Sequence, residues 1–197
     1  MAKSLSTSAF VKPDKGNKVV LQNYTAVKSY SKADAEQEFK EELNSWKSNG
    51  KDSPLELRFP GVKREQVPFF FDPKAFAQTV MSSSIQYLSL SELQNVYNLA
   101  QTGELARAIE KGAKLEELVQ KNKDFYAPLT SDPDVNGKTF NKVESFERWC
   151  QFIKSKTPIL PTILLHCNGK YFHVVGQTRL VAGLSCGYIM PCLVIEA

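Results

Sequence analysis

The sequence predicts an α+β fold, in which a small mixed β-sheet carries an added N-terminal helical region. Two observations support this prediction. In the first two thirds of the 197 residues, apolar side chains recur at helical spacing. In the last third, short apolar runs alternate with turn residues, as they do in strands. We therefore expect a tail over residues 1–18, a largely helical region over 19–136 and a core over 137–197, whose sheet can include strands near 55–71.

The N-terminal region contains one clear amphipathic segment. Over residues 31–47, the side chains of Ala35, Phe39, Leu43 and Trp46 recur at spacings of four, four and three. This spacing places them on one side of a helix. We expect a helix here that packs by this apolar stripe.

Strand and helix signals follow it. Residues 55–59 alternate apolar and polar side chains, which favours a strand. Residues 67–71 are aromatic and contain a proline, which favours an edge strand or a packed loop. Asp72 followed by Pro73 is typical of a helix start. Four helical pieces are expected after this point, over residues 73–81, 89–101, 103–111 and 115–122.

The core is predicted to contain a β-hairpin. Turn-forming residues over 123–139 predict a loop, and a helix is expected over 140–154. The dipeptide Asn168-Gly169 is a strong signal for a two-residue hairpin turn between strands over 158–165 and 171–175. A short helix and a last strand should complete the core, over residues 180–185 and 191–195.

The end of the second hairpin strand has the residues of a phosphate-binding turn. Gly176 has no side chain to block a close ligand, and Thr178 is expected to cap the next helix. The first N–H groups of that helix would then point into the turn, where the helix dipole favours an anion, and Gln177 lies in the turn itself. Arg179 could donate hydrogen bonds to two phosphate oxygens at once. We therefore predict a phosphate or nucleotide site formed by these four residues.

The charge distribution agrees with an anionic ligand. The chain has a net charge of +4, and residues 1–136 are neutral overall. Residues 137–197 contain seven Lys or Arg against three Asp or Glu, so this segment carries the whole excess. Such a bias suits a nucleotide or a nucleic acid, although a solvated basic face would have the same composition.

The core resembles the ParB/sulfiredoxin-like superfamily over about residues 140–197. The resemblance is carried by the order of a Pro-containing strand, an Asn-Gly turn, a Lys-Tyr strand, a Gly-x-x-Arg turn, a short helix, a glycine and a proline. Members of the superfamily bind nucleotides through the Gly-x-x-Arg turn, and they include CTP-hydrolysing DNA-partition proteins, sulfiredoxins and free-serine kinases. The matching residues here are Pro158-Ile159, Asn168-Gly169-Lys170-Tyr171, Gly176-Gln177-Thr178-Arg179, Gly187 and Pro191.

The sequence departs from the superfamily pattern at three points. Val175 stands where many members have an acidic residue. Gln177-Thr178 replaces the Glu-Arg of the partition proteins, which puts CTP clamping in doubt. No cysteine lies between the glycine and the arginine, where sulfiredoxins have their catalytic thiol, so peroxiredoxin repair is not expected.

Catalytic groups would have to come from elsewhere in the chain. His173 precedes the glycine by three residues and is the candidate general base or phosphate contact. Glu144 is the candidate carboxylate, with Glu147, Asp72 and Glu65 as alternatives among which the sequence does not choose. His166 is expected to lie on the neighbouring strand without facing His173 directly.

Two functions remain open on this basis. One is a nucleotide-dependent phosphotransferase or nucleotide hydrolase that uses Mg²⁺ with ATP or CTP and acts on or with DNA. The other is a non-catalytic nucleotide- or nucleic-acid-binding protein, of the kind expected in a phage or mobile element. The sequence decides neither the base nor the phosphate acceptor.

The composition also bears on location and metal binding. No run of eighteen apolar residues is present, and the N-terminus has no apolar run of signal-peptide length, so we expect a cytoplasmic protein without a membrane partner. Four cysteines occur, but none forms a Cys-x-x-Cys pair. A metal site built from thiolates is therefore not predicted.

Overall fold

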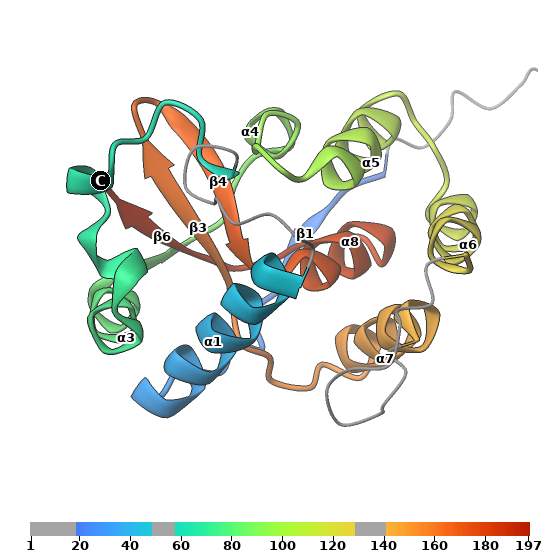
Figure 1. The fold of residues 1–197 in the computed structure, drawn as a ribbon. Coiled ribbons are helices and arrows are strands. Elements are labelled where there is room, and N and C mark those ends of the chain that lie inside the picture. The colour runs from blue at the N-terminus through green and yellow to red at the C-terminus, as the bar shows by residue number, and fades with distance from the viewer. Residues whose placement is uncertain (1–18, 49–57, 129–140) are drawn as a thin grey trace, which may run out of the picture.

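The fold is an α+β arrangement with helices on both faces of a small mixed sheet, as expected (Figure 1). The structure is a computed structural model that describes residues 19–48, 58–128 and 141–197. In these ranges, no helix is both long and apolar enough to cross a membrane.

The main sheet has four strands in the order β2-β6-β3-β4. β3 and β4 are antiparallel, β3 and β6 are parallel, and β2 lies antiparallel on the outer side of β6. Asn168 and Gly169 join β3 to β4 with φ angles of 52° and 72°, the backbone of the predicted two-residue turn. The strand bounds are Ser84–Gln86 for β2, Thr162–Cys167 for β3, Lys170–Val175 for β4 and Cys192–Glu196 for β6.

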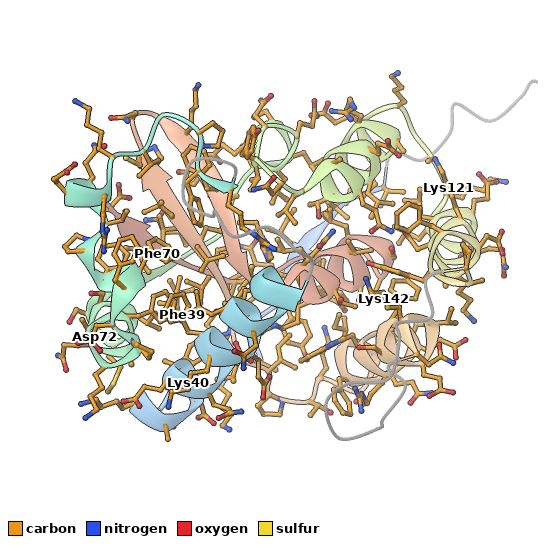
Figure 2. All side chains as sticks on the ribbon, viewed as in Figure 1. Phe39, Lys40, Phe70, Asp72, Lys121 and Lys142 are labelled. Carbon is orange, nitrogen blue, oxygen red and sulfur yellow. The ribbon has the colours of Figure 1, made fainter. Side chains whose placement is uncertain are left out.

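One face of the sheet is covered by α1, Lys32–Ser48, and α3, Pro73–Ser82. Their shared core is aromatic, and Figure 2 shows Phe39 and Phe70 on this side of the sheet. The rings of Phe39 and Phe76 stack with their centroids 3.9 Å apart. The predicted stripe of the first helix is therefore a packing face at Ala35 and Phe39, which are both fully buried.

The other face is covered by α8, around which three further helices pack. Buried side chains of these helices form one apolar cluster with the sheet residues Leu164, Cys192 and Val194. A two-stranded parallel sheet of β1 and β5 lies at the edge of this layer. The bounds are Ala100–Glu110 for α5, Leu115–Tyr126 for α6, Lys142–Lys154 for α7, Gln177–Ser185 for α8, Gln22–Asn23 for β1 and Tyr188–Ile189 for β5.

The helix starts follow their capping signals. Asp72 accepts a hydrogen bond from the N–H of Lys74 and caps α3, with Pro73 in the first turn as predicted. Asn141 caps α7 in the same way. α8 is an exception, because it begins at Gln177 rather than near Leu180.

Several expected elements differ. Of the strand expected over 55–59, residues 55–57 lie outside the described residues. The segment 67–71, expected as an edge strand or packed loop, contains a 3-10 helix, η2 at Pro68–Phe71, and another 3-10 helix, η1 at Arg64–Gln66, precedes it. α6 continues to Tyr126, where a loop was expected from residue 123.

The helix expected over 89–101 is also interrupted, and this break matters for the site. Only a short helix, α4 at Leu90–Leu93, forms at its start. The chain then pairs with the edge of β4: Tyr97 N–H donates to Tyr171 O at 2.8 Å, and His173 N–H donates to Tyr97 O at 3.1 Å. These bonds, together with a positive φ of 63° at Asn98, replace the helical bonds. The result is an irregular segment, residues 94–98, that meets the sheet at Tyr97.

Candidate functional site

The predicted phosphate-binding turn connects β4 directly to α8. Gly176 is the N-cap of α8, so the prediction that Thr178 caps this helix is wrong. The N–H groups of Arg179 and Leu180 turn back to Gly176 O, at 3.1 and 3.4 Å. The two preceding N–H groups, of Gln177 and Thr178, belong to the end of a helix where intrahelical partners are lacking. No side chain caps this turn within the described part of the chain.

Both the backbone conformation at position 176 and the limited space around it require a glycine. Its φ of 98° lies in the left-handed region that side-chain-bearing residues rarely adopt. A Cβ at this position would also lie 2.8 Å from Nε and 2.9 Å from Nη2 of Arg179. The glycine therefore lets the Arg179 side chain pass directly over the backbone of the turn.

The guanidinium of Arg179 faces the protein interior, and only 4% of the residue is exposed. Nη2 donates to Glu38 Oε2 at 2.8 Å, and Nη1 donates to Leu160 O at 2.9 Å and Pro161 O at 3.1 Å. Tyr30 completes the group by donating to Glu38 and accepting from Arg179 Nη1 at 3.4 Å. Burial lowers the pKa of Arg179, but Tyr30 and Glu38 raise this pKa by more, so the side chain stays charged.

These contacts give Arg179 a structural task. Arg179, which was expected to bind phosphate, instead joins α8 to α1 and to the residues before β3. Because a buried charge is tolerated only when it is paired and hydrogen-bonded, Glu38 is the partner that makes the position stable. Glu38 lies far from the turn in sequence, and no local motif links the two residues.

His173 is also directed away from solvent. It lies in β4 opposite Leu164, with 5% of the residue exposed. Burial, with a smaller effect of the nearby positive charges of Arg58 and Arg179, lowers the pKa of His173 to about 3. The ring is therefore neutral at neutral pH, and its Nε2 has no hydrogen-bond partner among the described residues. His166 faces Tyr171 instead, as expected, and pairs with Glu196.

The candidate carboxylates are spread over the surface. Glu144 is exposed in the first turn of α7, where its N–H is bound by the Asn141 cap. Glu147 pairs with Lys123 at 2.6 Å, and Asp72 caps α3 on the opposite face of the sheet. Within the described ranges, no three His, Cys, Asp or Glu side chains are grouped as metal ligands would be. A role for Mg²⁺ with ATP or CTP stays a prediction.

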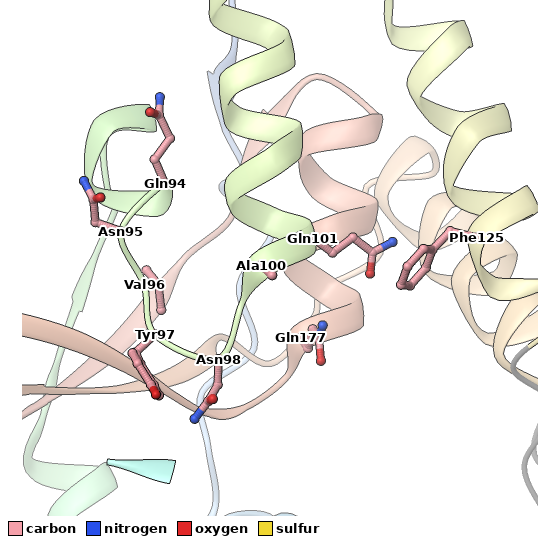
Figure 3. Close-up of a pocket in the computed structure, with 9 residues that line it drawn as sticks. All are labelled: Gln94, Asn95, Val96, Tyr97, Asn98, Ala100, Gln101, Phe125 and Gln177. Carbon is pink, nitrogen blue, oxygen red and sulfur yellow. The ribbon is translucent and has the colours of Figure 1, made fainter. Parts of the chain in front are cut away.

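A pocket of about 520 Å³ lies beside the start of α8 (Figure 3). Of the predicted site residues, Gln177 lines it, so the pocket and the turn share this residue. Its other walls come from the irregular segment 94–98 after α4, from the first turn of α5 and from the end of α6. The lining residues are Gln94, Asn95, Val96, Tyr97, Asn98, Ala100, Gln101, Phe125 and Gln177.

The lining is rich in carboxamide residues and has no charged residue. Five of its nine residues carry carboxamides. Two aromatic side chains, Tyr97 and Phe125, are about half exposed. Carboxamides offer both hydrogen-bond donors and acceptors, and aromatic faces offer stacking surfaces, so the pocket suits a planar polar ligand.

Three of these carboxamides donate hydrogen bonds to residues outside the pocket. Gln94 Nε2 donates to Glu110 Oε2 at 2.6 Å, and Asn95 Nδ2 donates to Ser91 O at 2.9 Å. Asn98 Nδ2 donates to Arg58 O at 2.7 Å, which fixes the turn at which the chain enters α5. The pocket wall is therefore fixed by polar contacts on three sides.

Thr178 lies at the inner side of the same region. It interacts with the hydroxyl of Tyr126. Burial raises the pKa of Tyr126, and Thr178 and Gln101 lower it by less, so that the pKa is about 12. Residues of the predicted turn thus meet residues of α5 and α6 near the pocket. No local motif predicts these partners, although carboxamide residues are dense over 94–101.

The structure thus places Gln177 in the pocket lining, with Gly176 and Thr178 beside it in the chain, and Glu144 is exposed on α7. It assigns the side chains of His173 and Arg179 to the interior. No protein-family model, no curated protein and no solved structure matches the chain.

Proposed function

We propose that this protein binds a nucleotide, with the base in the carboxamide-lined pocket and the phosphates at the N-terminus of α8. The observation that carries the proposal is the position of Gln177, which both lines the pocket and opens the helix. A ligand in the pocket would therefore reach the first N–H groups of α8 without crossing another element.

The pocket has the groups that nucleobases need. Every base offers a π-face, and stacking on an aromatic side chain is worth roughly 1–3 kcal/mol per base. Phe125 and Tyr97 expose such faces. Carboxamides can pair with base edges through their donor and acceptor atoms, and Gln177 is the carboxamide of the turn that lines the pocket.

The turn has the groups that phosphates need. The N-terminus of a helix presents N–H donors and a partial positive charge to an anion. α8 presents the N–H groups of Gln177 and Thr178 there.

Binding without turnover is the form of this function that the geometry supports best. The two groups expected to act on the phosphates, His173 and Arg179, face the interior, and Glu144 is exposed in α7. A phosphotransferase or nucleotide hydrolase of the ParB/sulfiredoxin-like type is the second candidate. The positive φ of Gly176 at a strand-to-helix turn favours it, and release of inorganic phosphate from ATP or CTP with Mg²⁺ would distinguish the two.

The proposal is tested by calorimetry of the full chain with ATP, CTP, GTP and UTP in the presence of Mg²⁺. We expect at least one to bind to the wild type and to bind about tenfold more weakly to Phe125→Ala, because a stacking surface is lost. Phe71→Ala is the matched control: Phe71 is 50% exposed and Phe125 is 51% exposed, but Phe71 belongs to η2, outside the pocket. Absence of nucleotide binding, or equal losses in the two variants, would overturn the proposal.

A further inference from the structure

Two cysteine side chains meet where α7 packs against the end of α8. Cys150 lies in the second half of α7, and Cys186 is the C-cap residue of α8. Both take part in the apolar cluster around α8, in which Cys150 is buried and Cys186 is partly exposed. The thiol of Cys150 donates a hydrogen bond to the sulfur of Cys186. The two residues are far apart in the sequence, so the packing of α7 on α8 brings their thiols together.

The other two cysteines of the chain lie in different surroundings. Cys167, at the end of β3, belongs to the aromatic cluster on the opposite face of the sheet and is 1% exposed. Cys192 begins β6, is 0% exposed and donates to Met190 O at 3.6 Å. All four thiols are free, and Cys186 is the one that is not buried. A reagent in solution therefore reaches Cys186 most easily.

The surroundings of the pair favour a thiolate at Cys186. The hydrogen bond from Cys150 lowers the pKa of Cys186, burial raises it by less, and the ammonium of Lys154 lowers it again. The same hydrogen bond and burial raise the pKa of Cys150, so Cys150 keeps its proton. Lys154 follows Cys150 by one turn of α7, on the same side of the helix. Its charge opposes the negative end of the α8 dipole, which disfavours a thiolate at the C-cap.

We propose that Cys186 and Cys150 form a redox-active pair that hydrogen peroxide converts to a disulfide. The Cys186 thiolate attacks one oxygen of the peroxide, the O–O bond breaks, and hydroxide leaves and takes up a proton to become water. Cys186 is then a sulfenic acid. The Cys150 sulfur attacks the Cys186 sulfur and loses its proton, and the S–O bond breaks with release of a second water. The two thiols thereby lose two electrons, and the peroxide gains them.

The position of the pair suits this reaction. The two sulfur atoms are hydrogen-bonded before the reaction, and they must approach to the S–S distance of about 2.05 Å. The bond would join the end of α8 covalently to α7. Because Cys186 lies at the opposite end of α8 from Gly176, the inference is independent of the proposed nucleotide binding.

The test is a count of free thiols in the full chain. The reduced protein is treated with a small excess of hydrogen peroxide, then unfolded in N-ethylmaleimide and analysed by mass spectrometry. The four free thiols of the reduced protein should fall by two, and peptide mapping should place the new bond between Cys150 and Cys186. Dithiothreitol should restore all four.

Serine variants separate the roles of the two thiols. Cys186→Ser should slow the oxidation about tenfold and form no disulfide, because the reactive thiolate is lost. Cys150→Ser should leave a sulfenic acid at Cys186, which dimedone traps, because the second thiol is lost. Cys167→Ser is the matched control: it changes a cysteine on the opposite face of the sheet and should form the disulfide as the wild type does.

The peptide map of the wild type decides the matter even where a serine variant does not fold. Four thiols that all remain after treatment with peroxide, or a disulfide that includes Cys167 or Cys192, would overturn the inference. The same treatment in urea should give slower oxidation without a preferred pair. Formation of the Cys150–Cys186 bond at the same rate in urea would show that the fold does not create the pair, and it would also overturn the inference.

Discussion

At the scale of single residues, the Gly176-to-Arg179 turn shows how one motif can serve the fold and a ligand at once. Gly176 makes room for the Arg179 side chain, and Arg179 uses that room to reach Glu38 on α1. The backbone N–H groups of Gln177 and Thr178 are left at the end of α8. The side chain expected to bind phosphate thus holds the turn in place, and the proposed anion site is left to the backbone.

Substitution of Gly176 by alanine should destabilise the protein by about 3 kcal/mol. Part of this loss comes from the left-handed backbone and part from the close approach to Arg179. Gly61→Ala is the control, because Gly61 has a φ of 83° but open space around a new Cβ, so that it should cost only about 1 kcal/mol. Urea unfolding of both variants measures the difference. Equal losses would show that the contact with Arg179 is not restrictive.

The buried imidazole of His173 predicts a loss of stability in acid. Its pKa is about 3 in the folded protein and about 6.5 when exposed, so the unfolded chain takes up the proton first as the pH falls. The stability contributed by the neutral ring is complete above pH 6.5 and falls by about 1.4 kcal/mol per unit between pH 6.5 and 3.

The pH dependence is best measured against His173→Leu. Between pH 7 and pH 5, the wild type should lose about 2 kcal/mol more than this variant in the free energy of unfolding. The comparison of slopes is independent of the offset that the substitution itself introduces. Parallel pH profiles of the two proteins would mean that His173 is not buried in its neutral form.

At the scale of elements, the sequence predicted features that depend on neighbouring residues. The Asn168-Gly169 turn, the Asp72-Pro73 start of α3 and the position of α7 all have local signals, and all are confirmed. The break after α4 has no such signal, because it depends on hydrogen bonds between Tyr97 and β4.

The candidate site divides in the same way. The location of a strand-to-helix turn at Gly176 could be predicted, since glycine and the change of pattern mark it. The burial of Arg179 could not, because its partner Glu38 lies 141 positions earlier in the chain. The pocket could not be predicted either, since Gln101 and Phe125 meet Gln177 only after α5, α6 and α8 have packed together.

The conformation of the irregular segment 94–98 beside the pocket depends on Asn98. Its φ of 63° suits Asn or Gly, and its side chain binds Arg58 O. Asn98→Gly keeps the backbone conformation and loses the bond, so it should destabilise by about 1 kcal/mol. Asn98→Ala loses the hydrogen bond and also strains the left-handed backbone, so it should destabilise the protein by about 2 kcal/mol. Chemical denaturation measures both values, and an alanine variant as stable as the glycine variant would contradict this role.

At the scale of the whole molecule, charge and layers are divided between the two faces of the sheet. The aromatic core between α1, α3 and the sheet has a packing role, and the pocket lies with α5, α6 and α8 on the other side. The net charge of +4 resides in residues 137–197, which supply β3, β4, α7 and α8. Anion binding is therefore expected on the side of the sheet that carries α8.

This charge is modest for a nucleic-acid-binding protein. We expect duplex DNA to bind weakly, without sequence preference, and with an affinity that falls steeply as salt rises. Fluorescence anisotropy with duplexes of different sequence, in about 50 and 200 mM salt, measures these properties. Tight binding that persists at the higher salt and selects one sequence would instead indicate direct readout of bases.

The central claim, that a nucleotide bridges the pocket and the start of α8, is tested most directly by amide NMR of the full chain titrated with ATP and with CTP. We expect the largest changes in chemical shift at the backbone N–H groups of Gln177 and Thr178 and at the side-chain amides of Gln101 and Asn98. Signals from α3, on the opposite face of the sheet, should stay in place. Unchanged spectra at saturating nucleotide, or changes centred on α3, would contradict it.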